Sequence, residues 1–280
     1  MDWGRAKTVL IFAFFVLNLI LGYELWLSGG ALGGPEGEAE TTIEDIRKLL
    51  SARGIRLDVE LPARPPRFQK YVLKLDEASL SSERTALEPP VPAPEGADAG
   101  EVWRAAAVRV DKGDEYEFDV WTSDGGVFVG FQLLAGVPVF GVELKFFREN
   151  GAVAAFHRQY AQPISEEGGE QPVLSAPDAL RRLLDAGAMP EGTSVRDVRF
   201  GLLYRPFEEP EGLTVPAWRV VLDVRPTSVG TASGQASSAQ AVAQGSGNGQ
   251  QPAASTRRIY FVEAYHGEVS EVRSQAANAG

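Results

Sequence analysis

The stretches VPAWRVVLDV (215–224) and IYFVEAYHGEV (259–269) decide the fold class of this 280-residue chain. Pro216 stands where a strand begins, because a missing N–H removes no ladder hydrogen bond at that position. The alternation that follows predicts a strand with one apolar face. That face carries Trp218, Val220, Leu222 and Val224. With a tight turn at His266-Gly267, the two stretches predict an antiparallel sheet.

A helix is predicted just before these strands. Ser175–Asp178 has the composition of a helix start, with a proline in the first turn, and Gly187 is a typical helix end. Leu180, Leu183 and Leu184 form the apolar stripe between them. Residues 166–280 are therefore predicted to form one module, a helix packed on an antiparallel sheet.

The preceding part of the chain has the same order of elements. Thr41–Glu44 fits a capping box, and an apolar stripe runs from there to Gly54. Residues 46–54 align with 180–187, and later strands end in a hairpin at Asn150-Gly151. We therefore predict an α+β fold of two related modules, 41–165 and 166–280, although amphipathic helices rich in Arg and Leu also look alike by chance.

Three segments are predicted to lie outside the packed elements. Residues 88–100 are rich in Pro, Ala and Gly and are predicted to form a long exposed loop. Residues 162–172 are polar and are expected to mark the boundary between the modules. Residues 226–256 are of low complexity and are predicted to be a disordered insertion, because they cannot bury enough apolar surface.

The N-terminal region predicts a membrane anchor. VLIFAFFVLNLILGYELWL (9–27) would span about 28 Å as a helix, close to the thickness of the hydrocarbon layer. Basic residues precede it and acidic residues follow it, so residues 1–8 are predicted to be a cytoplasmic tail and the C-terminal region to be extracytoplasmic. Residues 28–40 then form a flexible stalk. A signal peptide cleaved near 28–31 is the alternative, and the bulky residues 24–27 disfavour it.

Asn18 and Gly22 are four residues apart and share one face of this helix. A small residue lets two backbones approach and an amide can form hydrogen bonds between helices, so this face is a candidate for packing against another membrane helix. Glycine and one asparagine are also tolerated without such a role. The predicted anchors at the membrane interfaces are Trp3, Arg5, Lys7, Tyr23 and Trp26.

The composition excludes several functional classes. A net charge of −11 argues against a nucleic-acid partner, and the absence of cysteine excludes thiolate catalysis and Cys-ligated zinc. There are two histidines, His157 and His266, and we find no hydrolase, metalloprotease or nucleotide-binding motif. The acidic residues Glu115, Glu117 and Asp119 alternate along one predicted strand face, which is typical of a solvated face. We therefore predict no catalytic, cofactor or metal residue, and a protein that is not an enzyme.

Four further features of the sequence stand out: MDWGRAKT (1–8), NLILGY (18–23), GVPVF (136–140) and the Asn150-Gly151 hairpin before Tyr160. These features resemble those of the YycI (WalI) family. The strands quoted first also resemble a PepSY-type module, an exported helix-and-sheet unit found in regulators and inhibitory domains. Together these resemblances cover nearly the whole chain.

The resemblance implies a regulator in a Gram-positive cell membrane. YycI proteins act with YycH on the sensor histidine kinase WalK (YycG), which with WalR (YycF) controls cell-wall metabolism. The membrane helix is then expected to contact the kinase, and the outer region to pair with YycH. Two other hypotheses stay open: a membrane-tethered PepSY-like inhibitory module for an exported protease or cell-wall enzyme, and an exported hydrolase that uses acidic residues.

Overall fold

The computed structural model describes residues 14, 17, 18, 41–62, 67–208, 210–225 and 256–272. Among these residues, no helix is both long enough and apolar enough to cross a membrane. The predicted tail (1–8) and stalk (28–40) lie outside the described residues. So does the predicted membrane segment apart from residues 14, 17 and 18, and the predicted insertion apart from Thr256.

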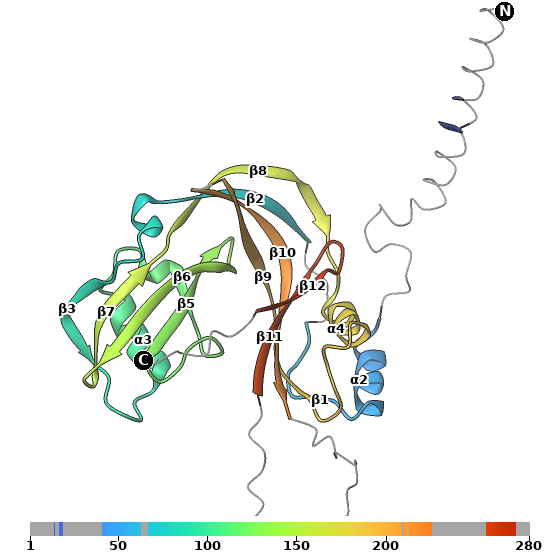
Figure 1. Cartoon of the computed structure of the whole chain (residues 1–280), viewed down its shortest axis with the longest axis horizontal. Coiled ribbons are helices and arrows are strands. Elements are labelled where there is room, and N and C mark those ends of the chain that lie inside the picture. The colour runs from blue at the N-terminus through green and yellow to red at the C-terminus, as the bar shows by residue number, and fades with distance from the viewer. Residues whose placement is uncertain are drawn as a thin grey trace, which may run out of the picture.

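The described chain has an α+β fold, as predicted (Figure 1). Its helices are α2 (Ile43–Ala52), α3 (Ala99–Ala107) and α4 (Ala176–Asp185), with 3-10 turns η1 (Glu77–Leu80) and η2 (Gly113–Glu115). Its strands are β1 (Arg56–Leu57), β2 (Arg67–Leu75), β3 (Thr85–Pro92), β4 (Tyr116–Asp119), β5 (Val127–Leu134), β6 (Val137–Glu149), β7 (Ala152–Arg158), β8 (Ala161–Pro172), β9 (Ser194–Glu208), β10 (Glu211–Val224), β11 (Thr256–Glu263) and β12 (Val269–Val272).

One lobe, here called the α3 module, is built from β3 to β7 and α3 (Figure 1). Its strands pair antiparallel in the order β3-β7-β6-β5-β4. Trp103 of α3 is 1% exposed, and its ring packs edge-on against Phe146 with centroids 5.1 Å apart. Gly130 of β5 lies under the indole, where a Cβ atom would approach Trp103 Cζ2 to 2.3 Å. The core of this module is therefore fitted around one tryptophan.

The other lobe, here called the α2–α4 module, contains β1, β9 to β12, α2 and α4 (Figure 1). Strands β9 to β12 pair antiparallel in sequence order, and β1 adds to β9 in parallel. The four apolar residues predicted to share one face of β10, Trp218, Val220, Leu222 and Val224, all belong to the core beneath the helices. The turn predicted at His266-Gly267 is present, with Gly267 at φ +74°.

The helix predicted to begin at Thr41 packs in the other module from the one expected. The buried residues of α2, Ile46 and Leu50, share a core with Leu180 and Leu183 of α4. The backbone N–H of Thr41 donates to Asp178 Oδ1 at 3.1 Å, which ties the starts of the two helices together. The helix that covers the first sheet is instead α3. The two similar helices therefore pack together in the α2–α4 module. The inferred repeat predicted one of them in each module.

Two further local predictions need correction. The N-cap of α2 is Thr42 rather than Thr41, since Thr42 Oγ1 accepts from the backbone N–H of Asp45. The stretch 88–100, predicted to be an exposed loop, contains most of β3 and the start of α3. Leu87 and Val91 of β3 and Ala93 after it are buried in the α3 module. Proline-rich edge strands lack donors, so their sequences look like loops.

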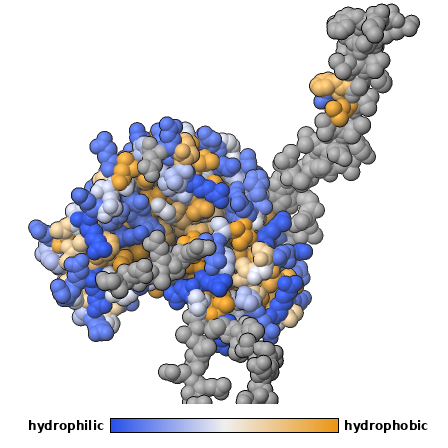
Figure 2. All heavy atoms as spheres, viewed as in Figure 1, coloured by the Kyte–Doolittle hydropathy of each residue, from blue (hydrophilic) through white to orange (hydrophobic). Residues whose placement is uncertain are grey.

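The polar segment 162–172 joins the modules instead of separating them. It forms β8, which pairs antiparallel with β2, and β2 pairs in turn with the start of β10. The two strands arch over the space between the lobes (Figure 1), and the surface on this side of the molecule mixes hydrophilic and hydrophobic residues (Figure 2). A short parallel pairing of β6 with β9, Val139 with Leu202 and Phe140 with Leu203, makes a second connection. The two modules thus share one continuous sheet.

Candidate functional site

Of the predicted membrane-facing residues, only Asn18 is among those the structure describes. Its side chain is exposed, and its Nδ2 donates to the backbone carbonyl of Phe14, one turn earlier in the helix, at 2.9 Å. One amide hydrogen is therefore used within the helix, while Oδ1 has no donor in the described part. Gly22 and the predicted anchors Trp3, Arg5, Lys7, Tyr23 and Trp26 lie outside the described residues.

The described residues contain no group of three or more His, Asp or Glu side chains placed to hold a metal ion. His157 Nε2 lies 2.7 Å from the backbone carbonyl of Ser81. The partner of this ring nitrogen is thus a backbone oxygen rather than a side-chain nucleophile.

The acidic face predicted for Glu115, Glu117 and Asp119 is only partly solvated, because Asp119 is buried while Glu115 and Glu117 are half-buried. Asp119 is 4% exposed, and all three carboxylates bind other side chains. Glu115 accepts from the hydroxyl of Tyr160 at 2.8 Å, and Glu117 accepts from Arg199 of β9. Asp119 Oδ2 accepts from Arg219 Nη1 of β10 at 2.7 Å. The second and third of these contacts cross from the α3 module to the α2–α4 module.

Arg219, Asp119 and Asp197 form what we call the Arg219 network. Arg219 is 1% exposed, and its Nη2 donates to Asp197 Oδ2 at 2.8 Å. Its guanidinium lies 5.2 Å from the ring centroid of Phe140. Arg219 lies on the face of β10 opposite Trp218, and Ala217 on the same face contributes to a small core between the modules. A buried charge is retained only when it is paired, so this network holds the two modules in one relative position.

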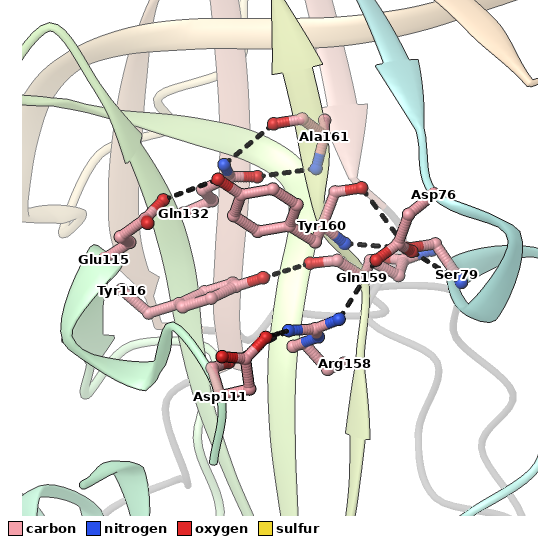
Figure 3. A network of polar contacts seen from close by, with 10 residues as sticks. All are labelled: Asp76, Ser79, Asp111, Glu115, Tyr116, Gln132, Arg158, Gln159, Tyr160 and Ala161. Carbon is pink, nitrogen blue, oxygen red and sulfur yellow. Dashed lines mark hydrogen bonds and ion pairs between the residues drawn. The ribbon is translucent and has the colours of Figure 1, made fainter.

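A second group of polar contacts, the Arg158 network, lies where the chain leaves the α3 module for the β8 strand (Figure 3). The guanidinium of Arg158 binds Asp76 Oδ2 through Nη2 at 3.0 Å and Asp111 Oδ2 through Nη1 at 3.1 Å. Asp76 follows β2 as the N-cap of η1, and Asp111 follows α3, so Arg158 joins three segments that are distant in sequence.

Tyr160 and Ala161 complete the Arg158 network (Figure 3). The backbone N–H of Tyr160 donates to Ser79 Oγ at 2.7 Å. The side chain of Gln132 makes two hydrogen bonds with the backbone of Ala161, 2.9 Å from Nε2 to the carbonyl and 2.8 Å from the N–H to Oε1. These bonds fix the direction in which β8 leaves the module.

Two tyrosines in this network have perturbed acidities. Burial raises the pKa of Tyr116 well above its ordinary value, and its hydroxyl donates to the backbone carbonyl of Gln159. Burial also raises the pKa of Tyr160, with a further contribution from its hydrogen bond to Glu115. Both phenols thus stay protonated donors at neutral pH and hold the structure together.

The sequence indicated neither network. A lone arginine in the apolar stretch 215–224 was the available signal for Arg219, because a charge amid buried residues requires a partner. The contacts in both networks orient secondary-structure elements relative to one another. Among the described residues, they expose no activated nucleophile. The site is therefore a junction at which charged and polar side chains join the two modules.

Comparisons with known proteins identify one family. The family model described as YycI protein matches residues 96–231, from the loop before α3 to just beyond β10. No curated protein sequence matches the chain. Among solved structures, the chain is similar to the crystal structure of an uncharacterized protein from Eubacterium rectale ATCC 33656 at 1.45 Å resolution. That match has 11% identity, covers 85% of this chain and 83% of the other, and has a TM-score of 0.39. The family match assigns residues 96–231, just under half of the chain, to the YycI family.

Proposed function

We propose that the chain is a membrane-anchored regulator of the sensor histidine kinase WalK (YycG), acting with YycH to modulate cell-wall signalling. YycI is a family of regulatory proteins associated with the WalK/WalR system, not a family of enzymes. The match to that family over residues 96–231, which include parts of both modules, is the observation that carries the proposal. A single-pass topology, with a cytoplasmic N-terminus and an extracytoplasmic C-terminal region, follows from the charge pattern around residues 9–27.

The junction between the modules supports a regulatory role that depends on the relative position of the two modules. A regulator biases a kinase with two arrangements only if it binds one of them more tightly. Because the Arg219 network joins the two modules, and the Arg158 network joins the α3 module to β2 and β8, a partner bound to one module also orients the other. Binding of YycH to the outer region would in this way set the position of the chain that leads back to the membrane.

Within the membrane, we propose that Asn18 and Gly22 face the helices of the kinase. Asn18 Nδ2 already donates to Phe14, so the group offered to a partner is Oδ1 together with the remaining amide hydrogen. Asparagine contacts of this kind between membrane helices are worth about 0.6–2 kcal/mol, enough to shift an equilibrium severalfold.

The alternative is a tethered inhibitory module for an exported protease or cell-wall enzyme. The packing of α4 over β10 and β11 favours it, since this is the helix-on-sheet arrangement on which the PepSY resemblance rests. In that case the extracytoplasmic region alone would be sufficient for activity.

A cross-linked pull-down of the full-length protein from its own membranes tests the proposal, with mass spectrometry of the eluate. We expect the kinase and YycH, and a loss of the kinase when residues 9–27 become polyleucine. Asn18→Leu should weaken kinase recovery severalfold. The matched control exchanges neighbours, Leu17→Asn with Asn18→Leu, which keeps the composition and moves the amide to another face.

The outcomes separate the two functions. Recovery of the kinase that is equal for the native chain and the polyleucine chain contradicts the contact in the membrane. An eluate of proteases or wall enzymes, unaffected by the polyleucine change, favours the tethered inhibitory module.

A further inference from the structure

An open groove of about 500 Å³ lies between α2 and β1, at the beginning of the folded region. Ile55, which is 3% exposed, and Leu57 give it an apolar floor. Arg47 and Lys48 of α2 line one side, and Arg56 of β1 lines the other. The groove therefore combines an apolar floor with three cationic side chains.

The charge of this groove is opposite to that of the whole protein. Residues 47–58 contain four basic residues and one acidic residue, in a chain with a net charge of −11. In the described part of the chain, no carboxylate is within ion-pair distance of Arg47, Lys48 or Arg56. The acidic residue, Asp58, is already paired with Arg196 at 2.9 Å. The groove thus presents positive charge that is not compensated by the described residues.

Arg56 is held in place before any ligand arrives. Its Nε and Nη2 both donate to Ser194 Oγ, at 3.1 and 2.7 Å, and Ser194 is 3% exposed. Nη1 remains free to donate. A guanidinium fixed in this way loses little rotamer freedom on binding, and its planar donors fit the oxygens of a phosphate group.

We propose that this groove binds the phosphodiester headgroup of an anionic phospholipid at the outer membrane surface. The proposal rests on the membrane anchor of the proposed function. Residues 28–40 are the whole connection between the predicted membrane segment and Thr41, and thirteen residues reach at most about 45 Å. A connection of this length keeps the anionic headgroups of the outer leaflet within reach of the groove. Binding them would turn α2 toward the membrane and set the orientation of the junction behind it.

The test uses the full-length chain in lipid nanodiscs. Because the chain has no cysteine, Ala52→Cys gives one labelling site on the exposed side of α2, next to the groove but not in its lining. A fluorophore there is quenched by lipids that carry a spin label on the headgroup. We expect stronger quenching in discs that contain phosphatidylglycerol than in discs of phosphatidylcholine alone.

Two charge variants give the comparison. Arg47→Glu with Lys48→Glu should abolish the dependence of quenching on phosphatidylglycerol. Each of the two basic side chains is expected to contribute about fivefold to binding of the anionic surface. Arg84→Glu with Arg104→Glu makes the same change of charge on exposed residues of the α3 module and should leave the dependence in place. Equal effects of the two pairs, or equal quenching in both lipids, overturn the proposal.

Soluble glycerophosphoglycerol separates a lipid from a free phosphodiester. If the soluble compound binds the labelled groove while quenching shows no dependence on phosphatidylglycerol, the ligand is not a membrane lipid and the proposal is overturned. A wrong prediction of the membrane anchor would give a distinct result, because the chain would then be absent from discs of either composition.

Discussion

Arg219 and Asp119 face each other across the junction of the two modules, with Nη1 donating to Oδ2 at 2.7 Å and both side chains at most 4% exposed. One stands on β10 of the α2–α4 module and the other on β4 of the α3 module. Asp119 also accepts from the hydroxyl of Thr122 at 2.7 Å, so its position is fixed from its own side as well. The relation of the two modules therefore depends on a charged contact that water does not reach.

Replacing Arg219 should be strongly destabilising. Arg219→Met leaves Asp119 as a buried carboxylate without its cation, which costs about 3–5 kcal/mol in the free energy of unfolding. Asp119→Asn added to Arg219→Met removes the stranded charge and should recover part of that loss. Urea unfolding followed by circular dichroism measures both variants.

The control for this prediction is Arg199→Met. Arg199 pairs with Glu117 in the same region, but the two side chains are 32% and 44% exposed. Exposed ion pairs contribute about 0–1 kcal/mol, so this variant should change the free energy of unfolding little. Similar losses for Arg219→Met and Arg199→Met would show that burial of the Arg219 network does not matter.

The raised pKa of Tyr116 predicts how the free energy of unfolding changes with pH in the alkaline range. Burial raises the pKa of its phenol above the unfolded value of about 10. Below pH 10 both states keep the proton and the contribution to stability is complete. Above pH 10 the unfolded state loses the proton while the folded state retains it, so stability should fall as pH rises. Urea midpoints between pH 9 and pH 11 measure this slope.

Tyr116→Phe supplies the comparison for that slope. It removes the titrating group and should make the loss of stability above pH 10 shallower. It should also lower stability at neutral pH by about 1 kcal/mol, because the carbonyl of Gln159 loses its donor. An unchanged slope in the variant would assign the alkaline transition to other groups.

Gly130 should not tolerate a side chain. A Cβ atom there would lie 2.3 Å from Trp103 Cζ2 and 2.8 Å from the backbone oxygen of Glu117, and the backbone atom cannot move aside easily. Gly130→Ala should therefore cost about 1–3 kcal/mol, the usual range for overpacking a core. Gly169→Ala on β8 is the control, since no atom lies within 4 Å of its added Cβ. Thermal unfolding of both variants distinguishes a clash at Trp103 from a general cost of losing glycine.

The sequence predicted best what local periodicity determines. The apolar face of β10, the helix start at Ser175 and the turns at Asn150-Gly151 and His266-Gly267 each follow from a few neighbouring residues. The sheet against which α2 packs could not be predicted in this way. The apolar stripe of the helix must be buried in a core, but both sheets provide a core, and the sequence of a helix does not distinguish between them.

The junction was harder still to predict. Asp119 alternates with Glu117 and so fits a solvated strand face, yet its partner Arg219 is 100 residues away. The alternation of side chains along a strand shows which residues share a face, but it does not show which element that face packs against. β8 illustrates the same limit, because nearly all of its residues are exposed and its pairing with β2 leaves no apolar pattern in the sequence.

The placement of α2 gives the last prediction. Ile46 is fully buried against the α4 core, so Ile46→Ala should lower the free energy of unfolding by about 2–5 kcal/mol. The location of the effect is more informative than its size. Amide hydrogen exchange should accelerate in α4 and β10 and stay unchanged in α3, because α2 shares a core with the first two and not with the third. Ser51→Ala, on the exposed side of α2, is the control and should leave exchange unaltered in both modules. Faster exchange confined to α3 would mean that α2 covers the first sheet in solution, as its position in the sequence suggested.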